Sequence, residues 1–141
     1  MFERETLKRI RVMVVDDSLQ FASAVGQFLA CSGNFEVLAS ANSGGEALAR
    51  ASSDRPDLMF IDIDMPGVNG LAVTSLIKGQ EAAPKIVMMT LEDSDEHRIG
   101  AIAAGADAFL PKDDFAQGFH AVLDLLFAQS GFNEESRAWH G

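Results

Sequence analysis

The chain has 141 residues, enough for one domain with its own core, and its balance of apolar and charged residues is that of an ordinary globular protein. Its 21 acidic residues outnumber the 11 basic ones, and the net charge of −10 disfavours direct nucleic-acid binding, which needs a basic surface. Cys31 is the only cysteine, so no internal disulfide can form. No apolar run has membrane-spanning length and the N-terminus lacks a signal-peptide core, so we expect a cytoplasmic protein with no membrane partner.

Short apolar runs alternate with helix-length segments along the chain, a pattern typical of a parallel sheet with crossover helices. The predicted strands cover about residues 11–16, 35–39, 57–62, 85–90 and 107–110. The predicted helices cover about residues 18–32, 43–53, 70–79, 94–104 and 114–128. We therefore expect an α/β domain at 10–128, an N-terminal extension at 1–9, and a tail or the start of a linker at 129–141.

Several helix boundaries have local signals. Ser43, followed three residues later by Glu46, is a capping box that opens the second helix. Gly33 and Gly105 are expected to end the first and fourth helices, because glycine tolerates left-handed backbone geometry. The first helix should bury one stripe, formed by Leu19, Ala22, Val25, Phe28 and Leu29. Cys31 is expected in the core, and no metal-ligand spacing relates the histidines, which are expected to be exposed: His97, His120 and His140.

Five polar residues follow or close the predicted strands. Asp16 and Asp17 follow the first strand, Asp62 closes the third, Thr90 closes the fourth and Lys112 follows the fifth. Parallel strands share the edge formed by their carboxyl ends, and ligands of such sheets bind in the crevice there. The five residues are therefore expected to form one site.

The residue types at this edge favour metal-assisted phosphoryl chemistry. Adjacent carboxylates such as Asp16 and Asp17 repel each other unless a cation binds, and oxygen-only ligands favour Mg²⁺, with Mn²⁺ as a substitute. A carboxylate such as Asp62 is a nucleophile toward phosphorus, and Lys112 and Thr90 would supply charge and a donor to the phosphoryl oxygens. Taken singly, these residues also have ordinary interpretations as a helix cap, turn residue, strand residue and surface lysine.

The order and spacing of these motifs resemble the receiver domain of bacterial two-component response regulators, over about residues 10–128. The motifs that carry the resemblance are Asp16-Asp17, Ile61-Asp62-Ile63-Asp64-Met65-Pro66-Gly67, Thr90, and Gly105-Ala106-Asp107-Ala108-Phe109-Leu110-Pro111-Lys112. The resemblance implies a flavodoxin-like three-layer sandwich, in which five helices cover a five-stranded parallel sheet of order 2-1-3-4-5.

The resemblance also implies a role for each matching residue. Asp62 would be the phosphoacceptor and Lys112 would bind its phosphoryl oxygens. The implied metal ligands are Asp17 directly, Asp16 mainly through water, Asp62, and the backbone carbonyl of Asp64. Thr90 would move toward the phosphate and Phe109 would swing inward, which alters the face formed by helix four, strand five and helix five.

Three rim residues give the site its own character. Leu91 follows Thr90, where the family usually has a small residue, and would narrow phosphodonor access. Asp64 and Glu92 add negative charge, and our hypothesis is that they alter the lifetime of the aspartyl phosphate.

The predicted function is therefore a signalling switch, phosphorylated by a sensor histidine kinase or phosphotransfer protein, that catalyses only its own phosphorylation and dephosphorylation. Pairing of two copies through helix four, strand five and helix five is a further expectation. A stand-alone receiver and the receiver of a larger regulator, including a DNA-binding one, both stay open. The alternatives are a haloacid-dehalogenase-like phosphatase that uses Asp62 and Asp64, and an interaction domain independent of phosphorylation.

Overall fold

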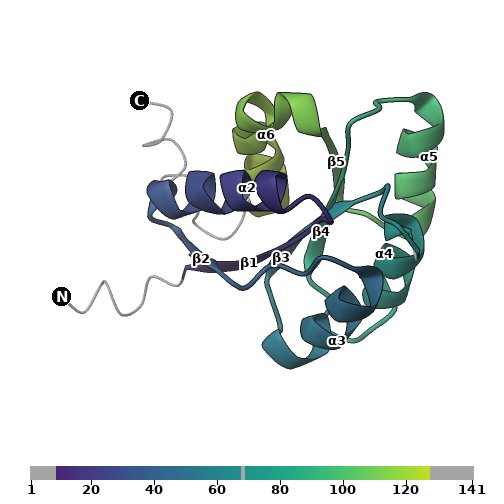
Figure 1. Ribbon diagram of the computed structural model, residues 1–141, viewed down its shortest axis with the longest axis horizontal. Coiled ribbons are helices and arrows are strands. Elements are labelled where there is room, and N and C mark those ends of the chain that lie inside the picture. The colour runs from purple at the N-terminus through teal and green to yellow at the C-terminus, as the bar shows by residue number, and fades with distance from the viewer. Residues whose placement is uncertain (1–8, 68, 128–141) are drawn as a thin grey trace.

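A computed structural model describes residues 9–67 and 69–127, which form five parallel strands with helices between them (Figure 1). The strands are β1 (Ile10–Val15), β2 (Phe35–Val37), β3 (Leu58–Asp62), β4 (Lys85–Thr90) and β5 (Ala108–Pro111). The helices are α2 (Leu19–Ser32), α3 (Gly44–Asp54), α4 (Gly70–Lys78), α5 (Asp95–Ala104) and α6 (Phe115–Phe127), with a 3₁₀ turn at Lys112–Asp114. The strand order β2-β1-β3-β4-β5 confirms the predicted flavodoxin-like sandwich. The predicted tail, with His140, and nearly all of the predicted extension lie outside the described residues.

Helices cover both faces of the sheet, α2 and α6 on one face and α3, α4 and α5 on the other (Figure 1). Side chains alternate between the faces along each strand, so Phe60 packs with α2 and α6 while Met59 and Ile61 pack with the opposite layer. Because both faces are covered, the central strand β3 is buried along its whole length and reads as a continuous apolar run until Asp62. Among the described residues, none of the helices is long and apolar enough to cross a bilayer.

The structure corrects three predictions of burial on the helices. The buried residues of α2 are Ala22, Val25 and Leu29. Leu19 is 67% exposed, so the prediction that it joins this stripe is wrong. It is the first residue of α2 and lines a groove at the surface with Val14 and Val37 instead of packing in the core. Cys31 is exposed rather than in the core, because it lies two positions after Leu29 and so faces away from the buried side. His120 of α6 is half-buried rather than exposed, beside the ring of Phe119.

The predicted helix boundary signals act as expected. The hydroxyl of Ser43 accepts a hydrogen bond from the Glu46 amide at 3.2 Å and opens α3. The Glu46 carboxylate accepts a hydrogen bond from the amide of Asn42 at 2.9 Å. In the usual capping box this bond comes from the capping residue itself, which is one position later. Gly33 and Gly105 adopt φ of 83° and 95° and end α2 and α5.

This cap gives a test of α3 stability. Replacing Ser43 by alanine removes the acceptor for the Glu46 amide and should lower the free energy of unfolding by about 1 kcal/mol. Replacing Ser43 by glycine should lower it by only about a few tenths of a kcal/mol, since glycine is tolerated at this position. Urea unfolding of the three proteins measures both effects. A serine-to-alanine variant as stable as the wild type would contradict the assigned cap.

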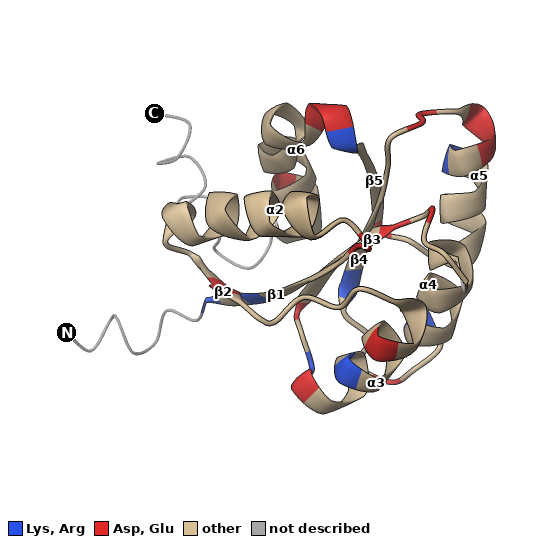
Figure 2. Ribbon diagram, in the orientation of Figure 1, with Lys and Arg blue, Asp and Glu red and all other residues tan. Residues whose placement is uncertain are grey.

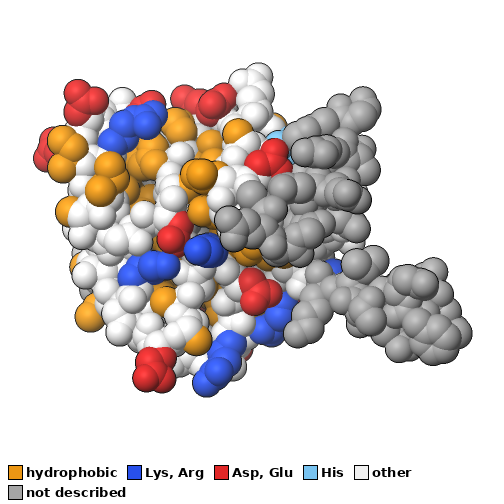
Figure 3. Space-filling model, turned by 180° about the vertical axis from the view of Figure 1, so that it is seen from behind, with side chains coloured by type: hydrophobic (Ala, Val, Ile, Leu, Met, Phe, Trp, Pro, Cys, Tyr) orange, Lys and Arg blue, Asp and Glu red, His pale blue; other side chains and the backbone are white. Residues whose placement is uncertain are grey.

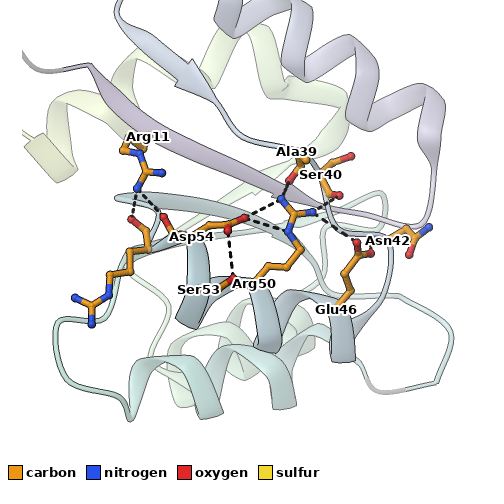
Figure 4. Close-up of polar contacts among 9 residues, drawn as sticks. Arg11, Ala39, Ser40, Asn42, Glu46, Arg50, Ser53 and Asp54 are labelled. Atoms are coloured by element: carbon orange, nitrogen blue, oxygen red, sulfur yellow. Dashed lines mark hydrogen bonds and ion pairs between the residues drawn. The ribbon is translucent and has the colours of Figure 1, made fainter.

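Arg50 of α3 fixes the loop that runs beside the first strand (Figure 4). Its guanidinium donates to the carbonyls of Ala39 and Ser40 at 2.6 and 3.0 Å, while two acidic side chains of the same helix pair with it. The next residue, Ala41, accepts a hydrogen bond from the amide of Asp16 at 3.0 Å. The loop held by Arg50 therefore supports the backbone at the carboxyl end of β1.

Candidate functional site

Three carboxylates meet at the carboxyl edge of the sheet, where Figure 2 shows acidic residues at the ends of the central strands. Asp16 and Asp17 follow β1, and Asp62 closes the adjacent strand β3. One oxygen from each lies within 4.8 Å of the others. Asp16 and Asp62 are buried and Asp17 is exposed, so the cluster is open to solvent on one side. The structure therefore brings Asp16, Asp17 and Asp62 together, as the sequence predicts.

Lys112 projects into the same cluster from the end of β5. Its ammonium lies 2.7 Å from Oδ2 of Asp16 and 3.3 Å from Oδ2 of Asp62, and its side chain is only 7% exposed. The ring of Phe21 lies 4.6 Å from the same nitrogen. Burial pulls the pKa of Lys112 down, but the hydrogen bonds and charges of Asp16 and Asp62 outweigh it and leave the pKa raised. Lys112 is therefore a fixed positive charge beside Asp62.

The surroundings of Asp62 disfavour the ionised form of its carboxyl group. Burial, followed by the negative charge of Asp16, raises its pKa to about 6, although Lys112 and the amide of Asp64 act in the opposite direction. The cluster thus has three carboxylates, and Lys112 pairs with two of them. The site has an excess of negative charge that a cation would offset.

Thr90 lies in a second polar cluster that adjoins the first. Its hydroxyl lies 3.2 Å from Oδ2 of Asp64 and accepts a hydrogen bond from the amide of Glu92 at 3.1 Å. The amide of Asp64 in turn donates to Oδ1 of Asp62 at 3.2 Å, which links the two clusters. Thr90 itself is fully buried, so its hydroxyl is directed by these partners rather than by solvent.

His97 belongs to this second cluster, and the prediction that it is simply exposed is wrong. Its side chain is 19% exposed, Nδ1 lies 2.7 Å from the carbonyl of Glu92, and Nε2 lies 3.7 Å from Oδ1 of Asp64. The Glu92 carbonyl is the main cause that raises the pKa of His97; burial opposes it and nearby acidic charges, including Asp64, add to it. The available signal was its place in the first turn of α5, directly after the strand-end Thr90 loop.

Phe109 lies apart from the acidic cluster, on β5, and is half-buried. The guanidinium of Arg98 lies over its ring at 4.7 Å from the centroid. Both residues border an apolar groove of about 390 Å³ between α5, β5 and α6. Figure 3 shows apolar side chains gathered over this part of the surface, on the upper left of that view.

The fold and the site together define a doubly wound α/β protein with an acidic, lysine-containing crevice at the carboxyl edge of its sheet. The sequence model of the response regulator receiver domain family matches residues 12–123 of this chain. The chain therefore belongs to the response regulator receiver domain family, a family of phosphorylation-based signalling switches. The match favours this prediction over the phosphatase alternative.

Individual relatives agree with the family assignment. A protein-glutamate methylesterase/protein-glutamine glutaminase of Idiomarina loihiensis is 35% identical, over 83% of this chain and 31% of the relative. The response regulator MprA of Mycobacterium tuberculosis is 36% identical, over 73% of this chain and 44% of the relative. The structure of the Vibrio cholerae chemotaxis protein CheY4 is similar with a TM-score of 0.72 and 29% identity, covering 81% of this chain and 98% of that one. The chain thus spans less than half the length of both curated relatives.

Proposed function

We propose that Asp62 accepts a phosphoryl group from the phosphohistidine of a sensor histidine kinase or phosphotransfer protein. The observation that carries this proposal is the contact of a buried carboxylate, Asp62, with the ammonium of Lys112 beside two further acids. A carboxylate oxygen of Asp62 would attack phosphorus as the bond from phosphorus to the imidazole nitrogen breaks. Lys112 then lies where it can pair with the phosphoryl oxygens in place of a carboxylate.

The acid cluster fits a magnesium ion. The donors are carboxylate oxygens only, and their excess negative charge is what a hard divalent cation offsets. Asp16, Asp17 and Asp62 would hold the ion, with the backbone carbonyl of Asp64 as a further ligand. Mn²⁺ would serve as a substitute. When bound, the ion supplies positive charge that neutralises the phosphoryl oxygens and orients them toward Asp62.

The output of the switch would be a change in the α5–β5–α6 face. In the proposal, Thr90 turns its hydroxyl toward the phosphoryl group and Phe109 moves inward. The groove beside Phe109 carries the exposed apolar residues Ile102 and Leu125, 76% and 70% exposed. This face is a suitable surface for a partner or for a second copy of the chain. We infer that the domain signals by such contacts and catalyses only its own phosphorylation and dephosphorylation.

Phosphorylation with a small-molecule donor tests the proposal. The protein is incubated with acetyl phosphate and Mg²⁺, and its intact mass and oligomeric state are recorded beside those of Asp62→Ala. We expect the wild type to gain the mass of one phosphoryl group only when a divalent cation is present, and the variant to gain none. Phosphorylation of the Asp62→Ala variant, or none of the wild type, would contradict the assignment.

The acidic rim should shorten the life of the phosphorylated state. The carboxylate of Asp64 lies beside Thr90 and that of Glu92 is exposed nearby, so both repel an anionic phosphoryl group. Replacing either by its amide, Asp64→Asn or Glu92→Gln, should slow dephosphorylation by about two- to fivefold. The decay of the phosphorylated mass after removal of acetyl phosphate measures this rate. Unchanged dephosphorylation rates in both variants would show that Asp64 and Glu92 do not affect the lifetime of the phosphorylated state.

A further inference from the structure

The first turn of α5 carries two adjacent side chains, His97 and Arg98, that reach the two proposed switch residues. The helix begins at Asp95, and Ser94 caps it through a hydrogen bond from the amide of His97 at 3.1 Å. His97 faces the loop after Thr90, while Arg98 lies over Phe109. One short helical turn therefore contacts both ends of the switch.

His97 acts on Thr90 mainly through Glu92, and its Nδ1 also lies 3.4 Å from the Thr90 hydroxyl oxygen. The 2.7 Å approach of Nδ1 to the Glu92 carbonyl requires the hydrogen on Nδ1, because a carbonyl oxygen can only accept. The amide of the same Glu92 donates to the hydroxyl of Thr90. The Thr90 hydroxyl has two acceptors at 3.2 Å, Asp64 Oδ2 and the carbonyl of Glu92. A neutral imidazole with its proton on Nδ1 supplies the donor that the Glu92 carbonyl needs.

Arg98 acts on Phe109 directly. Its Nε and Nη2 donate to the two carboxylate oxygens of Asp93 at 2.7 and 2.8 Å, which fixes the plane of the guanidinium. The fixed cation lies over the face of the Phe109 ring, where the aromatic quadrupole attracts it. An inward movement of Phe109 would give up this contact.

We propose that His97 and Arg98 are positioning residues that together hold the unphosphorylated arrangement of Thr90 and Phe109. We call this pair the resting-state clamp. The inference rests on the proposed function, because it takes the movement of Thr90 and Phe109 as the switching event. The clamp opposes that movement from the side of α5, so it sets how readily the domain enters its phosphorylated form.

The clamp differs from ordinary helix capping and surface pairing in the direction of its effect. A residue that only stabilises the fold would, when removed, lower stability and leave phosphorylation unchanged or slower. Removal of a contact made only in the resting arrangement should instead speed phosphorylation, because the active arrangement becomes more populated. A typical hydrogen bond is strong enough for a change of about fivefold.

The first arm of the test separates the hydrogen bond of His97 from its other properties. His97→Ala removes the donor to the Glu92 carbonyl and should speed phosphorylation by acetyl phosphate and Mg²⁺ about fivefold. His97→Asn places an amide nitrogen near the position of Nδ1 and should restore the wild-type rate. Faster phosphorylation in alanine with rescue by asparagine supports the clamp. Unchanged or slower phosphorylation in His97→Ala overturns it.

The second arm separates the plane of Arg98 from its charge. Arg98→Lys keeps the positive charge but loses the planar group over Phe109, and should speed phosphorylation about threefold. Ile99→Ala is the matched control, since Ile99 is the next residue of the same helix, is 66% exposed and lies outside the groove. The control should keep the wild-type rate. A rate in Arg98→Lys equal to that of the control overturns the role of Arg98.

A measurement without any phosphodonor keeps this inference separate from the proposed function. Amide hydrogen exchange at residues 91–94 should be faster in His97→Ala than in the wild type and in His97→Asn, because the Glu92 carbonyl has lost its donor. Circular dichroism and urea unfolding confirm that each variant is folded. If the wild type takes no phosphoryl group, the proposed function fails on its own. If exchange in His97→Ala equals that of the wild type, the clamp fails on its own.

Discussion

Replacing Asp62 by asparagine is expected to stabilise the folded protein and to abolish its phosphorylation. The pKa of Asp62 is raised to about 6 in the folded state by burial and by the charge of Asp16. The unfolded chain has an ordinary aspartate pKa of about 4, so the ionised carboxylate disfavours folding by roughly 2–3 kcal/mol above that range. Asparagine has no such charge, and it retains a carbonyl oxygen to accept from the amide of Asp64.

The stability difference between Asp62→Asn and the wild type should depend on pH. Between about pH 6 and pH 4 the folded wild type binds the extra proton, so its stability rises as the pH falls through this window. The advantage of Asp62→Asn should therefore be full at about pH 8 and absent below about pH 4. Urea unfolding of both proteins across this range, without divalent cations, measures the difference. Equal stability at the alkaline end would contradict the electrostatic account of Asp62.

Magnesium and a matched variant serve as controls. Under the proposed function, Mg²⁺ binds the folded wild type and should stabilise it in proportion to the logarithm of the metal concentration, which narrows the gap to Asp62→Asn. Asp64→Asn removes a carboxylate whose side chain is 60% exposed, so its effect on the unfolding free energy should stay within about 0.5 kcal/mol. A gain in stability equal to that of Asp62→Asn would show that net charge, rather than the buried site, is responsible.

The parallel sheet was predictable because its strands are buried on both faces. Strand β4 matches its predicted bounds, Lys85–Thr90. All of its residues after Lys85 are buried, and a strand that is buried on both faces has a nearly continuous apolar sequence that is easy to recognise. The edge strand β2 ends at Val37, two residues before its predicted end, because it pairs only with β1 and two of its three residues are exposed. The hydrophobic pattern of a strand is weakest at the edge of a sheet, where the strand pairs with only one neighbouring strand.

The site was predictable to the extent that topology alone brings residues together. Asp16, Asp62 and Lys112 meet because parallel strands end at one edge, and no detailed packing is needed to infer it. The place of His97 in the first turn of the predicted helix puts it near the Thr90 loop, but its contacts depend on how α5 is oriented over the end of β4. Neither the cap at Ser94 nor the spacing of the histidines contains that information. The contact of Arg98 with Phe109 is hidden from sequence reasoning for the same reason.

Replacing Gly70 by alanine should destabilise the fold and damage the site together. Gly70 opens α4 against the end of β3, and its amide donates to the carbonyl of Ile63 at 2.9 Å. A Cβ on Gly70 would overlap the carbonyl oxygen of Asp62 and lie 3.0 Å from Cα of Ile63. These neighbours are backbone atoms that cannot rotate away, so α4 or the end of β3 must move, at a cost of about 3 kcal/mol or more.

A glycine in an open position provides the comparison. Gly45 lies in α3, and a Cβ added to it would meet no atom within 4 Å, so Gly45→Ala should raise the free energy of unfolding by about 0.5–1 kcal/mol. Urea unfolding and the rate of phosphorylation by acetyl phosphate are measured on both variants at low temperature, and circular dichroism gives the folded fraction of Gly70→Ala. The displacement in Gly70→Ala falls on the backbone of the proposed phosphoacceptor, so its phosphorylation should slow at least about tenfold even in the folded fraction. Wild-type phosphorylation in that fraction would mean that the close approach of α4 supports the fold but does not set the position of Asp62.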